Sequence, residues 1–315
     1  MTSLYTPDSP PLASPPPRGR FIATVAASDA ICHEHFRLTL RLPSFPPTFP
    51  GQFIQVACQS LDLDYTPEHQ FDWTTAAPTS LGGRELISPL ALLRRPLSLA
   101  GRRDLPDSSV ELDIIHRVVG VGTAWLSRLA RDDRVHILGP LGNHFQLPPP
   151  ETPAILVAGG VGIAPMLYLA STLPGRAIFF AGAITRDLLP LNNIAELAQY
   201  NIPSVLSTDD GSYAFHGPVT QALEQYLTRY LTPAVIYTCG PEPMMKRVAQ
   251  IALDRNLPCQ ISVERSMACG MGTCQSCVIR VRKPDPAKPP LAGKDWSYKL
   301  ACADGPVFSA ADLLW

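Results

Sequence analysis

Four of the eight cysteines crowd into the C-terminal part of the chain, and their spacing is the strongest chemical signal in the sequence. Cys269, Cys274 and Cys277 form a C-x4-C-x2-C pattern, and Cys302 follows after a long gap. Two irons need four thiolates in one small volume, and this spacing is typical of plant-type [2Fe–2S] centres. The alternative is a structural zinc site, which usually shows paired C-x2-C knuckles, and the x4 spacing disfavours it. We therefore predict a [2Fe–2S] cluster on these four cysteines.

Two earlier segments could hold a phosphate-bearing cofactor. The first is Arg95–Ser98, where an arginine at a strand end can bind a phosphate bidentately, a proline fixes the turn and a serine offers its hydroxyl to a ring system. The second is 115–123, where a strand passes through glycines into a helix N-terminus whose free N–H groups favour anions. An ordinary strand–turn–helix explains the second segment equally well.

Three loops that follow predicted buried strands suggest a dinucleotide site. Gly159, Gly160 and Gly162 come directly after an apolar run and permit a tight turn and the close approach of a pyrophosphate. The loop 207–211 follows a later strand. A third loop, with Cys239, Gly240 and Pro241, follows the last strand and opens a helix. Ligands bind at the carboxyl ends of strands in such sheets, so the three loops together predict a nucleotide.

Two adjacent aspartates bear on which nucleotide is bound. Asp209 and Asp210 place negative charge where the 2′-phosphate of NADP would sit, which favours NAD. The alternative is that both aspartates simply cap a turn.

The elements that position these residues change character along the chain. Residues 21–150 show short strands with a period of two, which predicts an antiparallel β-barrel. Residues 151–257 alternate buried strands with helices, which predicts a doubly wound α/β domain. Residues 258–315 form a small C-terminal cluster domain. The proline-rich segment 1–20 is predicted to be a disordered tail, and 60–90 an inserted loop.

Composition excludes several classes of function. The net charge of −1 gives no reason to expect nucleic acid as a partner. Residues 152–175 are uncharged, but their glycines and prolines favour a strand, a turn and a helix over a membrane span. Without a recognisable secretory signal, eight cysteines indicate thiols in a reducing cytoplasm rather than a disulfide scaffold.

Taken together, these residues resemble the ferredoxin-reductase superfamily, and in particular the electron-transfer subunits of NAD-linked dihydroorotate dehydrogenases. The resemblance covers residues 21–315. It is carried by the segments 94–98, 117–123, 139–143, 208–212, 239–245, 264–269 and 297–308. The insertion at 60–90 and the gap before Cys302 depart from the family pattern, and His116 stands where an aromatic residue is expected.

The resemblance implies the cofactors and their sites. It implies FAD at Arg95, Pro96, Leu97, Ser98, Ile115, His116, Arg117, Gly122 and Thr123. It implies NAD at the glycine loop, and a [2Fe–2S] cluster on the four cysteines. Nicotinamide exchanges two electrons and the cluster one, so a flavin must lie between them. We expect no catalytic acid or base in this chain.

The resemblance also implies a partner and a direction of flow. Electrons would pass from an FMN-containing dihydroorotate dehydrogenase catalytic subunit through the cluster and FAD to NAD⁺, in a heterotetramer with two copies of each subunit. Three alternatives stay open. They are a reductase subunit of another complex, such as an NADH-dependent ferredoxin:NADP oxidoreductase or a hydrogenase, the reductase arm of an oxygenase, and a cluster-bearing redox sensor. A sensor needs no hydride site, so intact nucleotide loops disfavour it.

Overall fold

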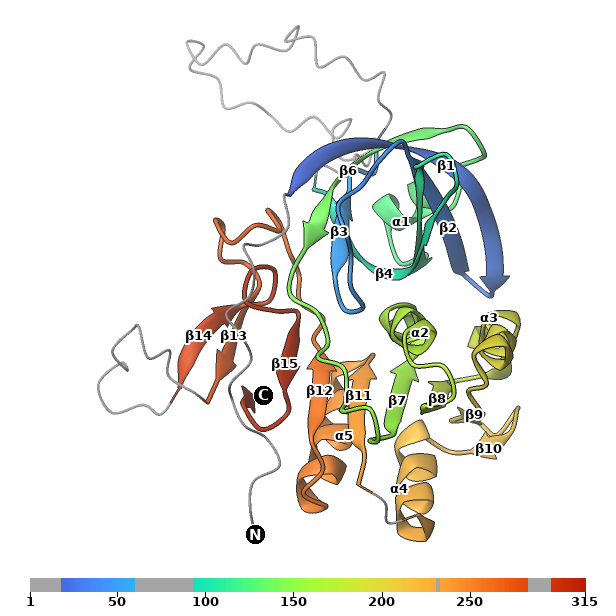
Figure 1. The fold of residues 1–315 in the computed structure, drawn as a ribbon, viewed down its shortest axis with the longest axis vertical. Coiled ribbons are helices and arrows are strands. Elements are labelled where there is room, and N and C mark those ends of the chain that lie inside the picture. Colours follow the sequence, from blue (N-terminus) through green and yellow to red (C-terminus); the bar gives the residue numbers. More distant parts are fainter. Residues whose placement is uncertain (1–17, 60–92, 231–232, 283–295) are drawn as a thin grey trace, which may run out of the picture.

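The computed structural model describes residues 18–59, 93–230, 233–282 and 296–315, which build three sheets (Figure 1). The barrel lies at the top of the view, the nucleotide sheet below it and the C-terminal strands to the left. The predicted insertion at 60–90 and most of the predicted tail lie outside the described residues. The predicted tail extends to residue 20, whereas the first strand already begins at Gly19.

The first sheet is a closed antiparallel barrel, as predicted, with strand order β1-β2-β5-β4-β3-β6. Along β2 alternate leucines (Leu38, Leu40 and Leu42) point into a core shared with β5 and α1, because successive side chains in a strand face opposite sides. The elements are β1 (Gly19–Cys32), β2 (His35–Leu42), β3 (Phe53–Val56), β4 (Arg95–Asp104), β5 (Val110–Arg117), α1 (Val121–Leu126) and β6 (Arg134–Leu141).

The second sheet has the doubly wound α/β architecture that the sequence predicts, in the order β10-β9-β8-β7-β11-β12-β15. All neighbours are parallel except β12 and β15. Helices α2 and α3 pack on the face towards the barrel, and α4 and α5 on the other face.

The strands of this second sheet are β7 (Ala154–Gly159), β8 (Ala177–Ala183), β9 (Ser204–Thr208), β10 (Phe215–His216), β11 (Val235–Cys239), β12 (Cys259–Ser262) and β15 (Val307–Ser309). The helices are α2 (Ile163–Ser171), α3 (Leu191–Ala195), α4 (Val219–Arg229) and α5 (Glu242–Asp254), with short 3₁₀ turns η1 (Gly160–Gly162), η2 (Arg186–Leu188) and η3 (Glu196–Tyr200).

The third sheet is small and has the order β14-β13-β16, with β13 (Val278–Val281), β14 (Ser297–Leu300) and β16 (Leu313–Leu314). The predicted C-terminal domain, residues 258–315, contributes strands to two sheets. β13, β14 and β16 form the third sheet, whereas β12 and β15 belong to the nucleotide sheet. Asn143 fixes β15 at this place: its Nδ2 donates to the Val307 carbonyl and its Oδ1 accepts from the Val307 amide, both at 2.8 Å.

The uncharged stretch 152–175 forms β7, η1 and α2, as its glycines and prolines predict. Within the described ranges, no helix is both long and apolar enough to cross a membrane. The sequence predicts a helix from residue 123 to about 131, whereas α1 covers Val121–Leu126 and so begins and ends earlier than predicted. It ends where the Ser127 hydroxyl donates to the Ala124 carbonyl, after which tight turns bring Leu129 into the barrel core.

Candidate functional site

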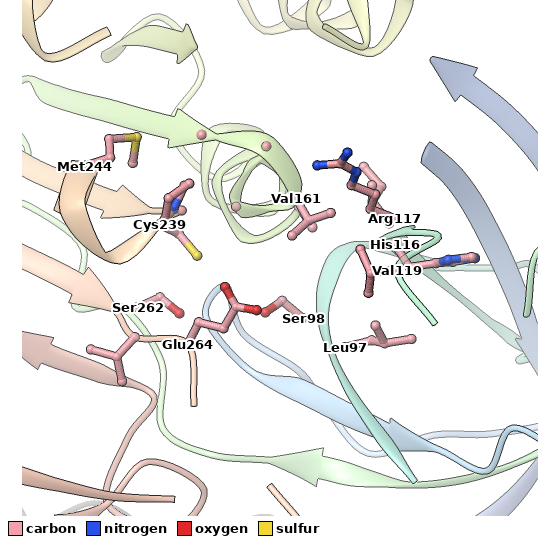
Figure 2. Close-up of a pocket in the computed structure, with 18 of the residues that line it drawn as sticks. Leu97, Ser98, His116, Arg117, Val119, Val161, Cys239, Met244, Ser262 and Glu264 are labelled. Atoms are coloured by element: carbon pink, nitrogen blue, oxygen red, sulfur yellow. The ribbon is translucent and has the colours of Figure 1, made fainter. Parts of the chain in front are cut away.

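A large pocket lies where the barrel meets the carboxyl ends of the nucleotide strands (Figure 2). Its volume is about 1240 Å³, whereas pockets for single small ligands usually measure roughly 300–1,000 Å³. Figure 2 shows Leu97 and Ser98 on one side and Cys239, Ser262 and Glu264 on the other. All the predicted flavin and nucleotide residues line it except Gly122 and Asp210.

The barrel wall of the pocket is formed by the ends of β4 and β5. Arg95–Ser98 begin β4, whose register is set by pairing with β3, so that Ser98 lies opposite Phe53 and Arg95 opposite Val56. The Arg95 guanidinium is held from one side, since its Nη1 donates to the Leu93 carbonyl at 2.8 Å. Its remaining N–H groups can bind a phosphate.

Buried polar atoms without a protein partner gather on this wall. His116 is 2% exposed and lies stacked on Phe36, yet neither of its ring nitrogens has a partner. Nε2 of His35 and Nε of Arg94 are also buried without a hydrogen-bond partner. His35, Arg94 and His116 all line the pocket. Burial lowers the pKa of His116 to about 4, so the ring is neutral at pH 7. Because buried polar groups normally have partners, this wall fits a polar cofactor.

The turn after β5 is shaped by one hydroxyl. Thr123 Oγ1 accepts from the amides of Val119 and Gly120, at 2.9 and 3.1 Å, and donates to the Gly120 carbonyl at 3.0 Å. The Thr123 side chain is therefore fully engaged in the turn, although it lines the pocket. Arg117 donates through Nε and Nη2 to Glu34, at 3.0 and 2.9 Å, so a cofactor phosphate must compete with that carboxylate for it.

The glycine loop after β7 forms the opposite wall. Gly160 has a φ of +53°, which a glycine adopts without strain. A Cβ at Gly162 would overlap the main chain of Cys239 and Gly240. The role of Gly162 is thus to let two strand ends come together, beneath the place where we predict the dinucleotide.

The two aspartates after β9 separate in the structure. Asp209 lines the pocket, whereas Asp210 does not. Asp210 Oδ1 accepts from the Ser212 amide at 2.9 Å and from the Ser212 hydroxyl at 2.6 Å. Hydrogen bonds from Ser212 hold the pKa of Asp210 below its ordinary value. Asp210 therefore caps a turn, and Asp209 is the carboxylate that faces the nucleotide site.

Sequence reasoning missed residues at the carboxyl end of β12 and directly after it. Ser262 and Glu264 line the pocket beside the half-buried Cys239, whose thiol has its pKa raised to about 12 by burial. Their position in the chain could have identified them, because they lie at the carboxyl end of a parallel strand, as the other pocket loops do. That signal is available only when β12 is assigned to the nucleotide sheet.

The four cluster cysteines lie in two pairs. The Cys274 amide donates to the Cys269 sulfur at 3.4 Å, and the Cys302 amide donates to the Cys277 sulfur at 3.4 Å. Pairing of β13 with β14 places Leu300 opposite Val278, which brings Cys302 beside Cys277 across the long gap in sequence. Among the described residues, no group of three or more His, Cys, Asp or Glu side chains is placed so that it could hold a metal ion. The two pairs of thiols match the ligand number of a [2Fe–2S] centre, which takes two cysteines on each iron.

The environment of the sulfurs also fits a cluster. The Met271 amide donates to the Cys269 sulfur at 3.5 Å. Gly270 and Gly272 have φ values of +73° and +94°, which let the loop turn its N–H groups inwards. Cys274 is exposed and a hydrogen bond from Ser276 lowers its pKa to about 6, whereas burial raises the pKa of Cys302 to about 12.

Comparisons with known proteins agree with this geometry. Residues 264–314 match the iron–sulfur cluster binding domain of dihydroorotate dehydrogenase B, and residues 156–250 match the oxidoreductase NAD-binding domain. The chain is 30% identical over 298 residues to the dihydroorotate dehydrogenase B (NAD(+)) electron transfer subunit of Caldanaerobacter subterraneus subsp. tengcongensis, covering 95% of this chain and 100% of the relative. The chain belongs to this family of electron transfer subunits.

Other members of the family and solved structures extend the likeness. The dihydroorotate dehydrogenase B electron transfer subunit of Geobacillus thermodenitrificans is 38% identical over 231 residues, which are 71% of this chain and 80% of that one. An NADH-dependent reduced ferredoxin-NADP oxidoreductase structure has a TM-score of 0.69 at 24% identity, covering 93% of this chain and 90% of that one. A cytochrome P450 reductase from Amycolatopsis has a TM-score of 0.55 at 25% identity, covering 77% and 68%. The family models thus give this chain an iron–sulfur cluster binding domain and an NAD-binding domain, and the solved structures share its fold.

Proposed function

We propose that this chain is the electron-transfer subunit of an NAD-linked dihydroorotate dehydrogenase in pyrimidine biosynthesis. It would receive electrons from the flavin of a catalytic subunit and pass them through a [2Fe–2S] cluster and FAD to NAD⁺. The observation that carries this proposal is that the lining of the pocket continues along the chain into the loop of cluster cysteines. Residues 262–267 line the flavin and nucleotide pocket and lead directly to Cys269, the first cluster cysteine. The proposed one-electron site and the proposed hydride site would therefore adjoin along one short segment.

The proposed assignment of residues follows the three parts of the chain. Residues 21–150 would hold FAD through Arg95–Ser98 and the end of β5. Residues 151–257 would hold NAD, and 258–315 the cluster, with β12 and β15 of that last segment completing the nucleotide sheet. The flavin is the group that exchanges both one and two electrons. The chain's own residues would orient the cofactors and exclude water between them.

Oxidation of dihydroorotate itself is assigned to a separate subunit. We propose an FMN-containing catalytic partner and a heterotetramer with two copies of each chain. We also propose a cytoplasmic location, because all eight cysteines are free and a reducing compartment keeps thiols in that state.

Reconstitution with and without the partner tests the proposal. The purified chain should contain iron, sulfide and FAD and should oxidise NADH with an artificial acceptor. Dihydroorotate-dependent reduction of NAD⁺ is expected when the chain is mixed with a flavin-containing dihydroorotate dehydrogenase, and not with either protein alone. Full activity of this chain alone with dihydroorotate would sink the proposal.

The alternative is a reductase subunit of another flavin and iron–sulfur complex. It is favoured by the extent of the structural match to the NADH-dependent ferredoxin-NADP oxidoreductase, which covers 93% of this chain. This alternative predicts co-purification with a partner that reduces ferredoxin or NADP⁺ and no coupling to dihydroorotate. The same reconstitution therefore separates the two functions.

A further inference from the structure

Gln55, on barrel strand β3, reaches out of the barrel to the loop that carries the first cluster cysteine. Its side chain is fully buried, with 0% exposed. Nε2 is 3.5 Å from the Ala268 carbonyl oxygen. With the amide turned by 180°, its nitrogen lies 3.3 Å from the Cys269 carbonyl oxygen and its oxygen 3.3 Å from the Gly270 amide nitrogen. In either orientation the partners of Gln55 are main-chain atoms of the cluster loop.

The contact between Gln55 and this loop is direct. A Cβ at Gly270 would lie 2.5 Å from Gln55 Nε2 and 2.6 Å from Cδ, and Gly270 also has a φ of +73°. No larger residue fits here while Gln55 keeps its place. The glycine that follows Cys269 is thus required both by the turn of the loop and by the glutamine that packs on it.

The strand that carries Gln55 also supports the predicted flavin motif. In the antiparallel pair β3–β4, Gln55 lies opposite Pro96, with Ile54 opposite Leu97 and Val56 opposite Arg95. On its other side β3 pairs with β6, where Gln55 lies opposite Leu138. One rigid piece of barrel sheet therefore holds the flavin wall on β4 and, through Gln55, the cluster loop.

We propose that Gln55 is a positioning residue that fixes the cluster loop relative to the flavin strand and tunes the cluster through the main-chain groups of Cys269 and Gly270. This inference rests on the proposed function and names a device within the same site. Groups behind the ligands orient a metal centre, and hydrogen bonds to cluster sulfurs set its potential. A side chain that engages the Gly270 amide decides whether that N–H is directed at the cluster or away from it.

A second buried glutamine provides a matched control. Gln52, just before β3, is 2% exposed. Its Oε1 accepts from the Phe49 amide at 2.9 Å and its Nε2 donates to the Gly142 carbonyl at 3.2 Å. Both residues are core amides of the same segment with main-chain partners. Only the partners of Gln55 belong to the cluster loop, so Gln52→Leu reports the cost of removing a buried amide as such.

The experiment compares wild type, Gln55→Leu, Gln55→Glu and Gln52→Leu as full-length chains loaded with FAD and cluster under anaerobic conditions. The measurements are iron and sulfide per flavin, the electron paramagnetic resonance spectrum of the reduced cluster, its midpoint potential, and stopped-flow reduction by NADH. In Gln55→Leu we expect an unchanged rate of flavin reduction. Cluster retention or the rate of cluster reduction should fall on the order of tenfold, with an altered resonance spectrum. Gln55→Glu keeps the length and one acceptor oxygen but loses the N–H that donates to a main-chain carbonyl of the loop. A carboxylate oxygen would face that carbonyl, so the loop should shift and both the resonance spectrum and the midpoint potential should change.

The outcomes separate this inference from the proposed function. If wild type binds neither flavin nor cluster, both fail. If wild type is loaded but Gln55→Leu matches it in spectrum, potential and cluster reduction, the role of Gln55 alone is overturned. The same holds if Gln52→Leu reproduces every change. Should Gln55→Leu not fold, the test passes to Gln55→Glu, and the inference is overturned if that variant matches wild type in both resonance spectrum and midpoint potential.

Discussion

Arg37 of the barrel forms a salt bridge with Glu196 of the nucleotide domain, with 3.0 Å between Nη1 and Oε2. The same guanidinium also donates through Nη2 to Asp113, at 2.7 Å, and the side chain of Asp113 is 1% exposed. Burial alone would raise the pKa of Asp113, but Arg37, Thr39 and Arg103 hold it below its ordinary value. One arginine therefore stabilises a buried carboxylate and links the barrel to the nucleotide domain.

The two contacts of Arg37 should differ greatly in their contribution to stability. Arg37→Leu leaves Asp113 buried with one fewer charge partner, and we expect a loss of roughly 3 kcal/mol in the free energy of unfolding. Glu196→Gln breaks the exposed contact and should cost under about 1 kcal/mol. Urea-induced unfolding at pH 7 measures both. Equal losses in the two variants would show that the link between domains, and not the buried carboxylate, dominates.

His116 should make stability depend on pH in the weakly acidic range. Burial lowers its pKa to about 4 in the folded chain, whereas an unfolded histidine titrates near 6.5. The unfolded state therefore binds more protons between these values, and stability is lost as the pH falls from 6.5 towards 4. From pH 7 to pH 5 the expected loss is roughly 2 kcal/mol.

The variant His116→Phe tests this prediction, because a phenyl ring keeps the stacking on Phe36 without the titrating nitrogens. Its free energy of unfolding should change less between pH 7 and pH 5 than that of wild type. His33→Gln, at a histidine whose side chain is 67% exposed, is the control and should keep the wild-type slope. A wild-type slope in His116→Phe would assign the pH dependence to other groups.

The sequence predicts the architecture well because its signals are local. The period of two along β2 and the apolar run of β7 each determine an element by themselves. The cysteine spacing is equally local at Cys269–Cys277. The cysteine spacing does not reveal the pairing of β13 with β14, and this pairing brings Cys302 to the other three cysteines.

Contacts between distant segments are what sequence reasoning could not supply. The short strand β12 carries no signal that it joins the nucleotide sheet, so Glu264 was not recognised as a pocket residue. Gln55 is unremarkable within its strand, and its contact with the cluster loop depends on how two domains meet. The aspartate pair could not be separated either, since the Ser212 hydrogen bonds to Asp210 depend on the conformation of the turn.

Asp209 should discriminate between NADH and NADPH, and Asp210 should not. Asp209 lines the pocket, so its charge would repel a 2′-phosphate, whereas Asp210 is engaged with Ser212. We expect Asp209→Asn to raise kcat/KM for NADPH about tenfold, equivalent to about 1.4 kcal/mol, with a small change for NADH. Steady-state reduction of an artificial acceptor by each nucleotide gives both values. An equal gain in Asp210→Asn would point to long-range charge rather than a contact.

Removal of one buried cluster ligand should separate the one-electron site from the hydride site. Cys302 is 1% exposed and lies beside Cys277, to whose sulfur its main-chain amide donates a hydrogen bond. Cys302→Ala should therefore lose the cluster while the flavin pocket, which this residue does not line, keeps FAD. Iron and sulfide should fall to background, NADH oxidation with ferricyanide should stay within about twofold of wild type, and coupling to the partner subunit should fall by at least about 100-fold.

The matched control is Cys58→Ala, at a buried cysteine of the barrel core, which should keep iron, flavin and coupling. Loss of FAD in Cys302→Ala would instead mean that the cluster is needed to form the flavin pocket, and retention of iron would remove Cys302 from the ligand set.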